Sequence, residues 1–398
     1  MDLTGKRKQG VLMLKTATKF FILFFCVCAG GQLMSVSFAQ ESVQECVLCA
    51  EAEALIVNMG LREAPSPVRT RDGWMPPKFI LTVFPDQFVE QMRKVAPNAE
   101  IVSLQNVRDS KVAMERADVF IGVCTPELAD YGVNLKWIQL YSAGVDSCTA
   151  HPEFVERDIL VTNGQRLSGP QIGEHAIALT LALAHKLDVY AAEQATGQWE
   201  RDILDDTQVI PAGLWELDGR TMLVAGLGGI GTQIARRAHG LGMRVIATRN
   251  SSREGPDYVD YVGLSHELSD LAMQADVVAS ALPLTDSTRG VYDSEFFEAM
   301  KNTAVFINVG RGETVVTDDL VAAIRDGQIA GAGLDVAHPE PLPSGHPLWS
   351  LPNVIMTPHI AASSNQLVGR IVTLQIENLR RYVAGDAMLS VVDLERGY

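Results

Sequence analysis

The segment "TMLVAGLGGIGTQIARRAHGLG", residues 221–242, decides the fold of this chain. An apolar, strand-like run comes first, three glycines follow in the pattern G-x-G-x-x-G, and a helical stretch comes after them. In this context Gly226 permits a tight turn, Gly228 lets backbone amides approach a phosphate, and Gly231 lets the helix pack closely on the strand. The helix N-terminus adds free N–H groups and partial positive charge. The segment predicts a dinucleotide-binding unit; a glycine-rich turn without a ligand is the alternative.

The rest of the chain alternates apolar strand candidates with helical or loop segments. Five strand candidates lie between residues 78 and 164, and six lie between residues 221 and 359. This alternation implies parallel sheets with crossover connections. We therefore predict an α/β fold with two doubly wound parallel-sheet domains. An apolar helix over 173–187 joins them, and a last helix over 365–385 is expected to return to the first. The predicted boundaries are 78–169 plus 363–398 for one domain and 170–362 for the other.

Composition and charge limit the classes of partner. The chain has 398 residues, 47% of them hydrophobic and 20% charged, which is ordinary for a globular protein of two domains. Its 33 basic and 48 acidic residues give a formal charge of −15. Such an acidic chain is a poor binder of nucleic acid over a broad surface. An anionic ligand would have to be held locally, by a helix N-terminus or by single arginines.

The N-terminal residues have the pattern of a secretory signal. Residues 1–19 carry five positive charges and one negative, and an apolar run too short to span a bilayer follows over 20–31. Ser37 and Ala39 then stand at the −3 and −1 positions of a cleavage site before Gln40. Residues 1–39 therefore predict an exported or periplasmic protein. An uncleaved anchor, or a misplaced start codon and a cytoplasmic protein, remain open.

Residues 40–77 read as an N-terminal arm or linker, and the cysteines give no metal site. The stretch 64–77 is rich in proline and has no periodicity. Cys46 and Cys49 form a C-x-x-C pair, but no second pair or histidine pair follows at zinc spacing. A local disulfide and two surface thiols both remain open for this pair. Structural roles are expected for Cys124 and Cys148.

The residues after the strand "RVIAT" (244–248) bear on the choice of dinucleotide. An NAD site usually has a carboxylate here for the ribose hydroxyls, and this chain has none. Arg249, Ser251 and Arg253 occur instead, and their donors suit a 2′-phosphate. The sequence thus favours NADP(H) over NAD(H). The alternative is that Arg249 stacks on the adenine and NAD still binds.

Polar residues also end three successive strand candidates of the second unit. The strand in "VFINVGRGETV" (305–315) ends at Arg311, Asp335 and Glu340 follow the strand in 331–342, and His359 lies in "TPHIA" (357–361). Ligands of open α/β sheets bind at the carboxyl ends of the strands. Taken singly, the residues could be a surface cation, solvated acids and a packed histidine. Taken together, they predict one active-site rim that also carries the glycine turn.

These motifs, in this order, resemble those of the D-isomer-specific 2-hydroxyacid dehydrogenases, in particular the NADP-leaning glyoxylate/hydroxypyruvate reductase-like members. The resemblance covers residues 78–398. It implies a flavodoxin-like substrate domain and a Rossmann cofactor domain with the active site in the cleft between them. The matching motifs are "SAGVD" (142–146), "GLGGIG" (226–231), "LPLTDSTRGVY" (282–292), "INVGRG" (307–312), "GLDVAHPEPLP" (333–343) and "TPHIA" (357–361).

The resemblance also implies roles for individual residues. Arg311, Glu340 and His359 match the catalytic trio, and Asp335 matches the aspartate that contacts the nicotinamide amide. The substrate carboxylate would be held by Arg311 and the backbone amides of Ala143, Gly144 and Val145. The other implied cofactor contacts are Gly229, Ile230, Leu282, Pro283, Thr288, Val309, Gly310 and Ala361.

The predicted reaction is hydride transfer between NAD(P)H and a small 2-oxo or D-2-hydroxy acid. Arg311 would pair with the carboxylate and polarise the carbonyl, while His359 would donate a proton and Glu340 would stabilise the imidazolium. A nucleotide-sensing protein of the same fold without turnover is the alternative, although retention of the trio favours an enzyme. Formate oxidation has no support in substrate-specific residues. A homodimer is expected by resemblance, because residues 201–215 match a dimer arm.

Overall fold

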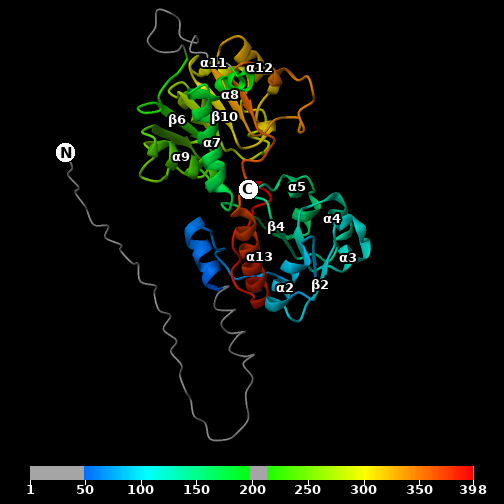
Figure 1. Ribbon diagram of the computed structural model, residues 1–398. Coiled ribbons are helices and arrows are strands. Elements are labelled where there is room, and N and C mark those ends of the chain that lie inside the picture. The colour runs from blue at the N-terminus through cyan, green and yellow to red at the C-terminus, as the bar shows by residue number, and fades with distance from the viewer. Residues whose placement is uncertain (1–48, 198–212, 398) are drawn as a thin grey trace, which may run out of the picture. The chain divides into compact units, whose positions relative to one another are not determined.

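The computed structural model describes residues 49–197 and 213–397 (Figure 1). These residues all fall within one compact unit of the chain, Val47–Tyr398. The predicted signal (1–39), Cys46 and most of the predicted dimer arm lie outside the described residues. None of the described helices is both long enough and apolar enough to span a bilayer.

The first sheet has five parallel strands in the order β2-β1-β3-β4-β5. This is the flavodoxin-like order, and all five strands were predicted. Every residue of β1, β3, β4 and β5 is buried, as expected when helices cover both faces of a parallel sheet. The strands are β1 (Phe79–Thr82), β2 (Glu100–Ser103), β3 (Val119–Gly122), β4 (Trp137–Leu140) and β5 (Leu160–Thr162). The helices of this part are α2 (Asp86–Val95), α3 (Lys111–Arg116), α4 (Pro126–Tyr131), α5 (Asp146–Thr149), α6 (Glu153–Glu156) and α13 (Leu367–Ala384).

The second sheet has seven parallel strands in the order β12-β11-β10-β9-β6-β7-β8. Six strands were predicted, and the prediction missed β8 at the edge of the sheet. Three residues, the first of them exposed, are too few to show an alternating pattern. The strands are β6 (Thr221–Ala225), β7 (Arg244–Thr248), β8 (Tyr261–Gly263), β9 (Val277–Ser280), β10 (Val305–Asn308), β11 (Gly331–Leu334) and β12 (Val354–Met356).

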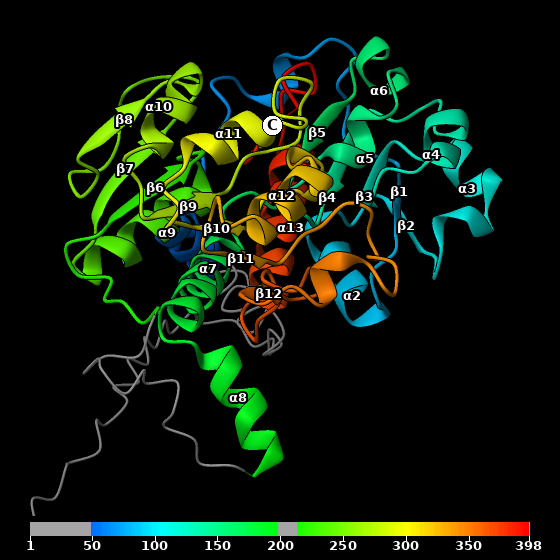
Figure 2. The ribbon, with the colours of Figure 1, turned by 90° about the horizontal axis from the view of Figure 1, so that it is seen from above.

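The apolar helix α7 (Gly169–Ala184) packs against α9 (Gly229–Gly240) and against β10 and β11. It was predicted over 173–187, but Lys186 has a φ of 53° and so ends its regular path. The next helix, α8 (Leu187–Thr196), has no buried residue and extends away from the second sheet (Figure 2). The other helices here are α10 (Leu268–Ala272), α11 (Ser294–Ala299) and α12 (Thr317–Arg325). Single 3₁₀ turns occur at η1 (Val68–Thr70), η2 (Val107–Asp109), η3 (Ser265–Glu267), η4 (Gly312–Thr314) and η5 (Pro347–Trp349).

The segment before the first sheet is docked onto the molecule. Residues 49–59 form a helix that the sequence did not indicate. Ile56, Met59 and Leu61 belong to a hydrophobic cluster with Leu374 of α13 and Leu389, which places the helix beside α13 (Figure 1). The following residues form backbone hydrogen bonds with the chain around 385–390. Residues 49–77 are therefore a fixed part of the fold.

The C-terminal helix α13 returns to the first sheet, as predicted, and packs on α2. Its Tyr382 ring stacks on Trp137 of β4 at a centroid distance of 4.8 Å. Glu377 accepts hydrogen bonds from Arg380 and Arg381. Burial raises the pKa of Glu377, but these two arginines outweigh burial and the net pKa is lowered. The cluster thus stabilises α13 through a largely buried, compensated carboxylate.

A disulfide joins Cys124, just after β3, to Cys148 of α5, with a Cα–Cα distance of 5.1 Å. The sequence predicted structural roles for both residues but not their pairing. Since α5 directly follows the "SAGVD" loop, this bond fixes the base of that loop to the first sheet. Cys49 is exposed and forms no disulfide with another described residue.

Candidate active site

Three functional candidates lie at the carboxyl ends of neighbouring strands. The strands β10, β11 and β12 are adjacent in the sheet. Arg311 follows the end of β10, Asp335 comes directly after β11, and His359 follows β12. The rim expected from the sequence therefore exists as a geometric feature.

His359 and Glu340 form a close pair. Imidazole Nδ1 lies 2.7 Å from Glu340 Oε2, and the other carboxylate oxygen accepts the Ala337 N–H at 2.9 Å. Their side chains are 49% and 38% exposed, so a ligand can reach them. Because Nδ1 faces the carboxylate, Nε2 is the ring nitrogen left for a substrate. The pair has the arrangement in which a carboxylate orients a histidine for proton transfer.

Asp335 holds the loop that carries His359. It is only 3% exposed. Its carboxylate accepts from Thr357 Oγ1 at 2.6 Å and from the N–H groups of Ile360 and Ala361 at 2.9 and 3.0 Å. The sequence did not indicate this anchoring role, and the expected contact with a nicotinamide amide stays a prediction.

His175 of α7 supports the same loop, and the sequence had not predicted a role for it. Its Nε2 lies 2.8 Å from Thr357 Oγ1 and 3.7 Å from Asp335 Oδ1. The only available signal was a histidine in an otherwise apolar helix, and that pattern is more often packing than function. The structure makes His175 a second support of the loop that presents His359.

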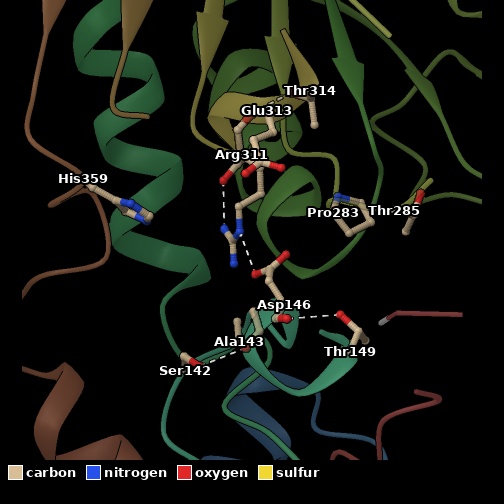
Figure 3. Close-up of polar contacts among 12 residues, drawn as sticks. Ser142, Ala143, Asp146, Thr149, Pro283, Thr285, Arg311, Glu313, Thr314 and His359 are labelled. Carbon is tan, nitrogen blue, oxygen red and sulfur yellow. Dashed lines mark hydrogen bonds and ion pairs between the residues drawn. The ribbon is translucent and has the colours of Figure 1, made fainter. Parts of the chain in front are cut away.

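Arg311 reaches from the second sheet to the "SAGVD" loop. Its Nε donates to Asp146 Oδ2 at 3.0 Å, and Nη1 donates to the Gly310 carbonyl at 2.8 Å (Figure 3). The imidazole of His359 points toward this guanidinium (Figure 3). A Cβ added to Gly144 would lie 1.7 Å from Arg311 Nη2, so the guanidinium rests directly on the loop backbone. Asp146 ended the quoted motif, but no role had been predicted for it.

The loop itself offers donors to an anion. Ser142 Oγ donates to the Gly144 carbonyl at 2.9 Å, and Asn163 donates to the Ala143 carbonyl at 2.7 Å. The N–H groups of Ala143, Gly144 and Val145 have no acceptor within the described residues. Backbone amides beside an arginine suit a carboxylate. These three candidates therefore lie with Arg311, as the resemblance implied.

The glycine turn has the features that a dinucleotide needs. Gly226 has a φ of +92°, which disfavours any other residue. A Cβ on Gly231 would lie 2.0 Å from the Gly226 carbonyl oxygen, so the turn packs tightly on the helix. A Cβ on Gly228 would meet nothing within 4 Å, which leaves open space at the start of α9. With Gly229 and Ile230 as the first residues of that helix, the turn fits a bound pyrophosphate.

The other cofactor candidates line the adjoining strand-end loops. A Cβ on Gly310 would lie 2.8 Å from the Leu282 carbonyl oxygen, so these two loops touch. Thr288 Oγ1 donates to the Pro283 carbonyl at 2.7 Å and closes the loop after β9. Only backbone atoms are available at the two remaining candidates, whose side chains are buried: Val309 and Ala361.

The three cofactor-binding candidates after β7 differ in whether another side chain already binds them. Arg249 Nη1 donates to the Glu254 carbonyl at 2.8 Å, and Ser251 is exposed. Arg253 is already paired with Glu267, at 2.7 Å, and with the Tyr261 hydroxyl. Hydrogen bonds from Tyr261 and Arg253 lower the pKa of Glu267 to about 2. Arg253 therefore has a fixed partner, and Arg249 is the better placed cation for a ligand.

Comparisons with known proteins agree with this geometry. A family model described as "D-isomer specific 2-hydroxyacid dehydrogenase, NAD binding domain" matches residues 177–361. The human glyoxylate reductase/hydroxypyruvate reductase is 34% identical over 265 residues, covering 66% of this chain and 78% of the human protein. A glyoxylate reductase of Korarchaeum cryptofilum is 31% identical over 308 residues, covering 75% of this chain and 88% of the archaeal protein.

A solved structure extends the similarity. An NADPH-dependent glyoxylate/hydroxypyruvate reductase from Sinorhizobium meliloti, in complex with NADP and sulfate, matches with a TM-score of 0.69 and 25% identity. The match covers 81% of this chain and 100% of that chain. The chain belongs to the D-isomer specific 2-hydroxyacid dehydrogenase family. It is an oxidoreductase that transfers hydride between a nicotinamide cofactor, NAD(P)H, and small 2-oxo or 2-hydroxy acids.

Proposed function

We propose that the chain is an NADPH-dependent reductase of short 2-oxo acids such as glyoxylate and hydroxypyruvate, with Arg311, Glu340 and His359 as its catalytic residues. The observation that carries the proposal is the 2.7 Å contact between His359 and Glu340 on the strand-end rim shared with Arg311. The glyoxylate and hydroxypyruvate reductase names of the similar proteins support the substrate class.

Arg311 and the loop amides bind and orient the substrate. The substrate carboxylate accepts hydrogen bonds from the free N–H groups of residues 143–145 and from the guanidinium, which also polarises the carbonyl. The Asp146 carboxylate holds Arg311 Nε at 3.0 Å and leaves Nη2 directed at the loop. Orientation of this kind brings the carbonyl carbon to a fixed position before the reaction.

His359 supplies the proton that completes the reduction. When bound, NADPH supplies the hydride that adds to the carbonyl carbon. The imidazolium donates its Nε2 proton to the carbonyl oxygen, which becomes the hydroxyl of the product, and the ring is left neutral. Glu340 accepts from Nδ1 and stabilises the charged ring before the transfer. Asp335 keeps the histidine loop in place through its three hydrogen bonds.

Preference for NADPH is supported by the absence of a carboxylate after β7 and by the position of Arg249. An acidic residue there would repel a 2′-phosphate, whereas a guanidinium attracts it. The solved structure from Sinorhizobium meliloti that resembles this chain is in complex with NADP.

The test is a panel of 2-oxo acids with NADPH and with NADH, together with the His359→Gln variant. The proposal expects turnover of glyoxylate or hydroxypyruvate, a higher kcat/KM with NADPH, and a large loss of turnover in the variant. Tight NADPH binding with no turnover of any acid would instead mark a nucleotide-sensing protein.

We also propose that the protein is exported and that it forms a homodimer. The signal-like residues 1–39 and the Cys124–Cys148 disulfide support an oxidising compartment. Free NADPH is not expected there, so fractionation of the source cells is a direct test of export. The dimer is supported by resemblance and by α8, which has no buried residue and precedes the expected dimer arm. Light scattering of the purified protein tests the dimer.

A further inference from the structure

Arg166 lies at the glycine turn although no sequence motif pointed to it. It follows β5, just before α7, and its φ is 71°, a left-handed conformation that glycine adopts more readily. A Cβ on Gly229 would lie only 2.7 Å from Arg166 Cγ, so the arginine stem crosses the first residue of α9. The strained backbone of Arg166 thus places its long side chain across the start of α9, one residue after Gly228.

The charges of two more arginines act on Arg166. A Cβ on Gly60 would lie 3.5 Å from Arg166 Nη1, so the guanidinium reaches the docked N-terminal segment that carries Arg62. On the other side, Thr248 accepts the Leu227 N–H at 2.8 Å, which brings Arg249 next to the turn. Burial and then the charges of Arg62 and Arg249 lower the pKa of Arg166. The arginine cluster, defined as Arg62, Arg166 and Arg249, therefore combines residues from three separate segments.

Among the described residues, the arginine cluster has no carboxylate partner. Within the part of the chain that the structure describes, no ion pair joins these guanidiniums to Asp or Glu, although neighbouring Arg69 and Arg253 each have one. Mutual repulsion of close cations is unfavourable unless an anion is present. In a chain with a formal charge of −15, an unpaired group of this kind indicates a site for a strong anion.

We propose that Arg62 and Arg166 bind, together with Arg249, the phosphate groups on the adenosine half of the dinucleotide. This inference rests on the proposed use of a phosphorylated nicotinamide cofactor and names residues that no motif assigns to it. It also gives residues 49–77 a function, because this segment contacts Arg166 at Gly60 and carries Arg62, whose charge acts on Arg166. Each guanidinium adds charge-assisted hydrogen bonds that a phosphate satisfies well.

The test measures binding rather than turnover. The variants are Arg62→Gln, Arg166→Gln and Arg166→Gly, of which the last suits the positive φ of that position. The control is Arg236→Gln, which removes the same charge from the exposed side of α9, where Arg236 bonds Gln233 at 3.2 Å. Titration calorimetry gives Kd values for NADPH, NADH, ADP and 2′,5′-ADP, and thermal melting confirms that each variant is folded.

Each variant of the cluster should raise the Kd for NADPH about tenfold, and the control should leave it within about twofold. A loss confined to NADPH and 2′,5′-ADP assigns the cluster to the 2′-phosphate, and an equal loss for NADH and ADP assigns it to the pyrophosphate. Unchanged NADPH binding in folded Arg62 and Arg166 variants overturns the inference. If the wild-type protein binds NADPH but turns over no 2-oxo acid, the proposed enzymatic function is overturned and the inference about the arginine cluster is not affected.

Discussion

Replacing Gly144 with alanine should displace the guanidinium of Arg311 and leave the stability of the fold nearly unchanged. The added Cβ would lie 1.7 Å from Arg311 Nη2 and 2.9 Å from Asp146 Oδ2. Ordinary contact begins near 3.4 Å, so the guanidinium must retreat by about 1.7 Å. Both obstructing atoms are at the ends of side chains that can rotate, and the backbone need not move.

The size of the effect follows from that displacement. A misplacement of about 1 Å in a substrate-orienting group costs roughly 10²-fold in rate. Loss of a charge-assisted hydrogen bond to the substrate carboxylate, about 1.5–3 kcal/mol, corresponds to a similar factor. The Gly144→Ala variant should therefore lose about 10²-fold in kcat/KM for glyoxylate, while its free energy of unfolding changes by less than about 1 kcal/mol.

Two further glycine variants complete the assay. The Cβ of Gly240→Ala would meet nothing within 4 Å, so this variant should leave activity unchanged and should not lower stability. Gly312→Ala would bring its Cβ within 1.8 Å of the Ala337 carbonyl oxygen, which is backbone, and should lower the melting temperature markedly. Steady-state kinetics, NADPH binding and thermal melting are measured for all three. Activity of Gly144→Ala within about twofold of wild type would refute the assignment of Arg311 to substrate binding.

Three other changes test separate parts of the structure. His359→Gln should lower kcat by about 10²–10⁴-fold with an unchanged Kd for NADPH, and normal turnover would remove the histidine from the mechanism. Cys124→Ser should destabilise the fold by about 2–4 kcal/mol, and a reductant should lower the melting temperature of the wild type but not of the variant; equal melting of both without reductant would contradict this. Glu377→Gln should cost about 3 kcal/mol at neutral pH, because it breaks a largely buried ion-pair cluster. The lowered pKa of Glu377 stabilises the fold above its usual value of 4.5, and this advantage is lost as the pH falls through the folded value, so denaturation curves of wild type and variant should converge in acid.

The sequence predicted those features that local pattern determines. Strands buried on both faces appear as apolar runs, and both parallel sheets followed from their alternation with helices. Gly226 and Gly231 could be recognised because a positive φ and a contact of 2.0 Å leave no alternative residue. The strand-end positions of Arg311 and His359 followed from the common direction of parallel strands.

What the sequence did not reveal depends on contacts between distant segments. Asp146 and Arg311 are 165 residues apart, and nothing local marks their 3.0 Å contact. Arg62 and Arg166 become candidates for phosphate binding only in the folded structure, where the segment before the first sheet contacts Arg166. Arg253 was predicted to bind the cofactor, and nothing in the sequence indicated its ion pair with Glu267. Glu267 belongs to the 3₁₀ turn η3, which follows β8, the strand that was not predicted.

The two residues in strained conformations at the proposed ligand sites differ in what supports them. His359 has a φ of 54°, and a left-handed residue costs roughly 1–2 kcal/mol. The buried Asp335 accepts three hydrogen bonds from residues of the loop that carries His359, and their free energy outweighs that cost. The fold itself therefore fixes the histidine. Arg166 has no such carboxylate within the described residues. Its conformation is opposed by nearby positive charge, and a bound phosphate would remove that opposition. The proton donor is therefore held in place by the fold before the cofactor binds, whereas the arginine cluster would gain stability from the phosphate that we propose as its ligand.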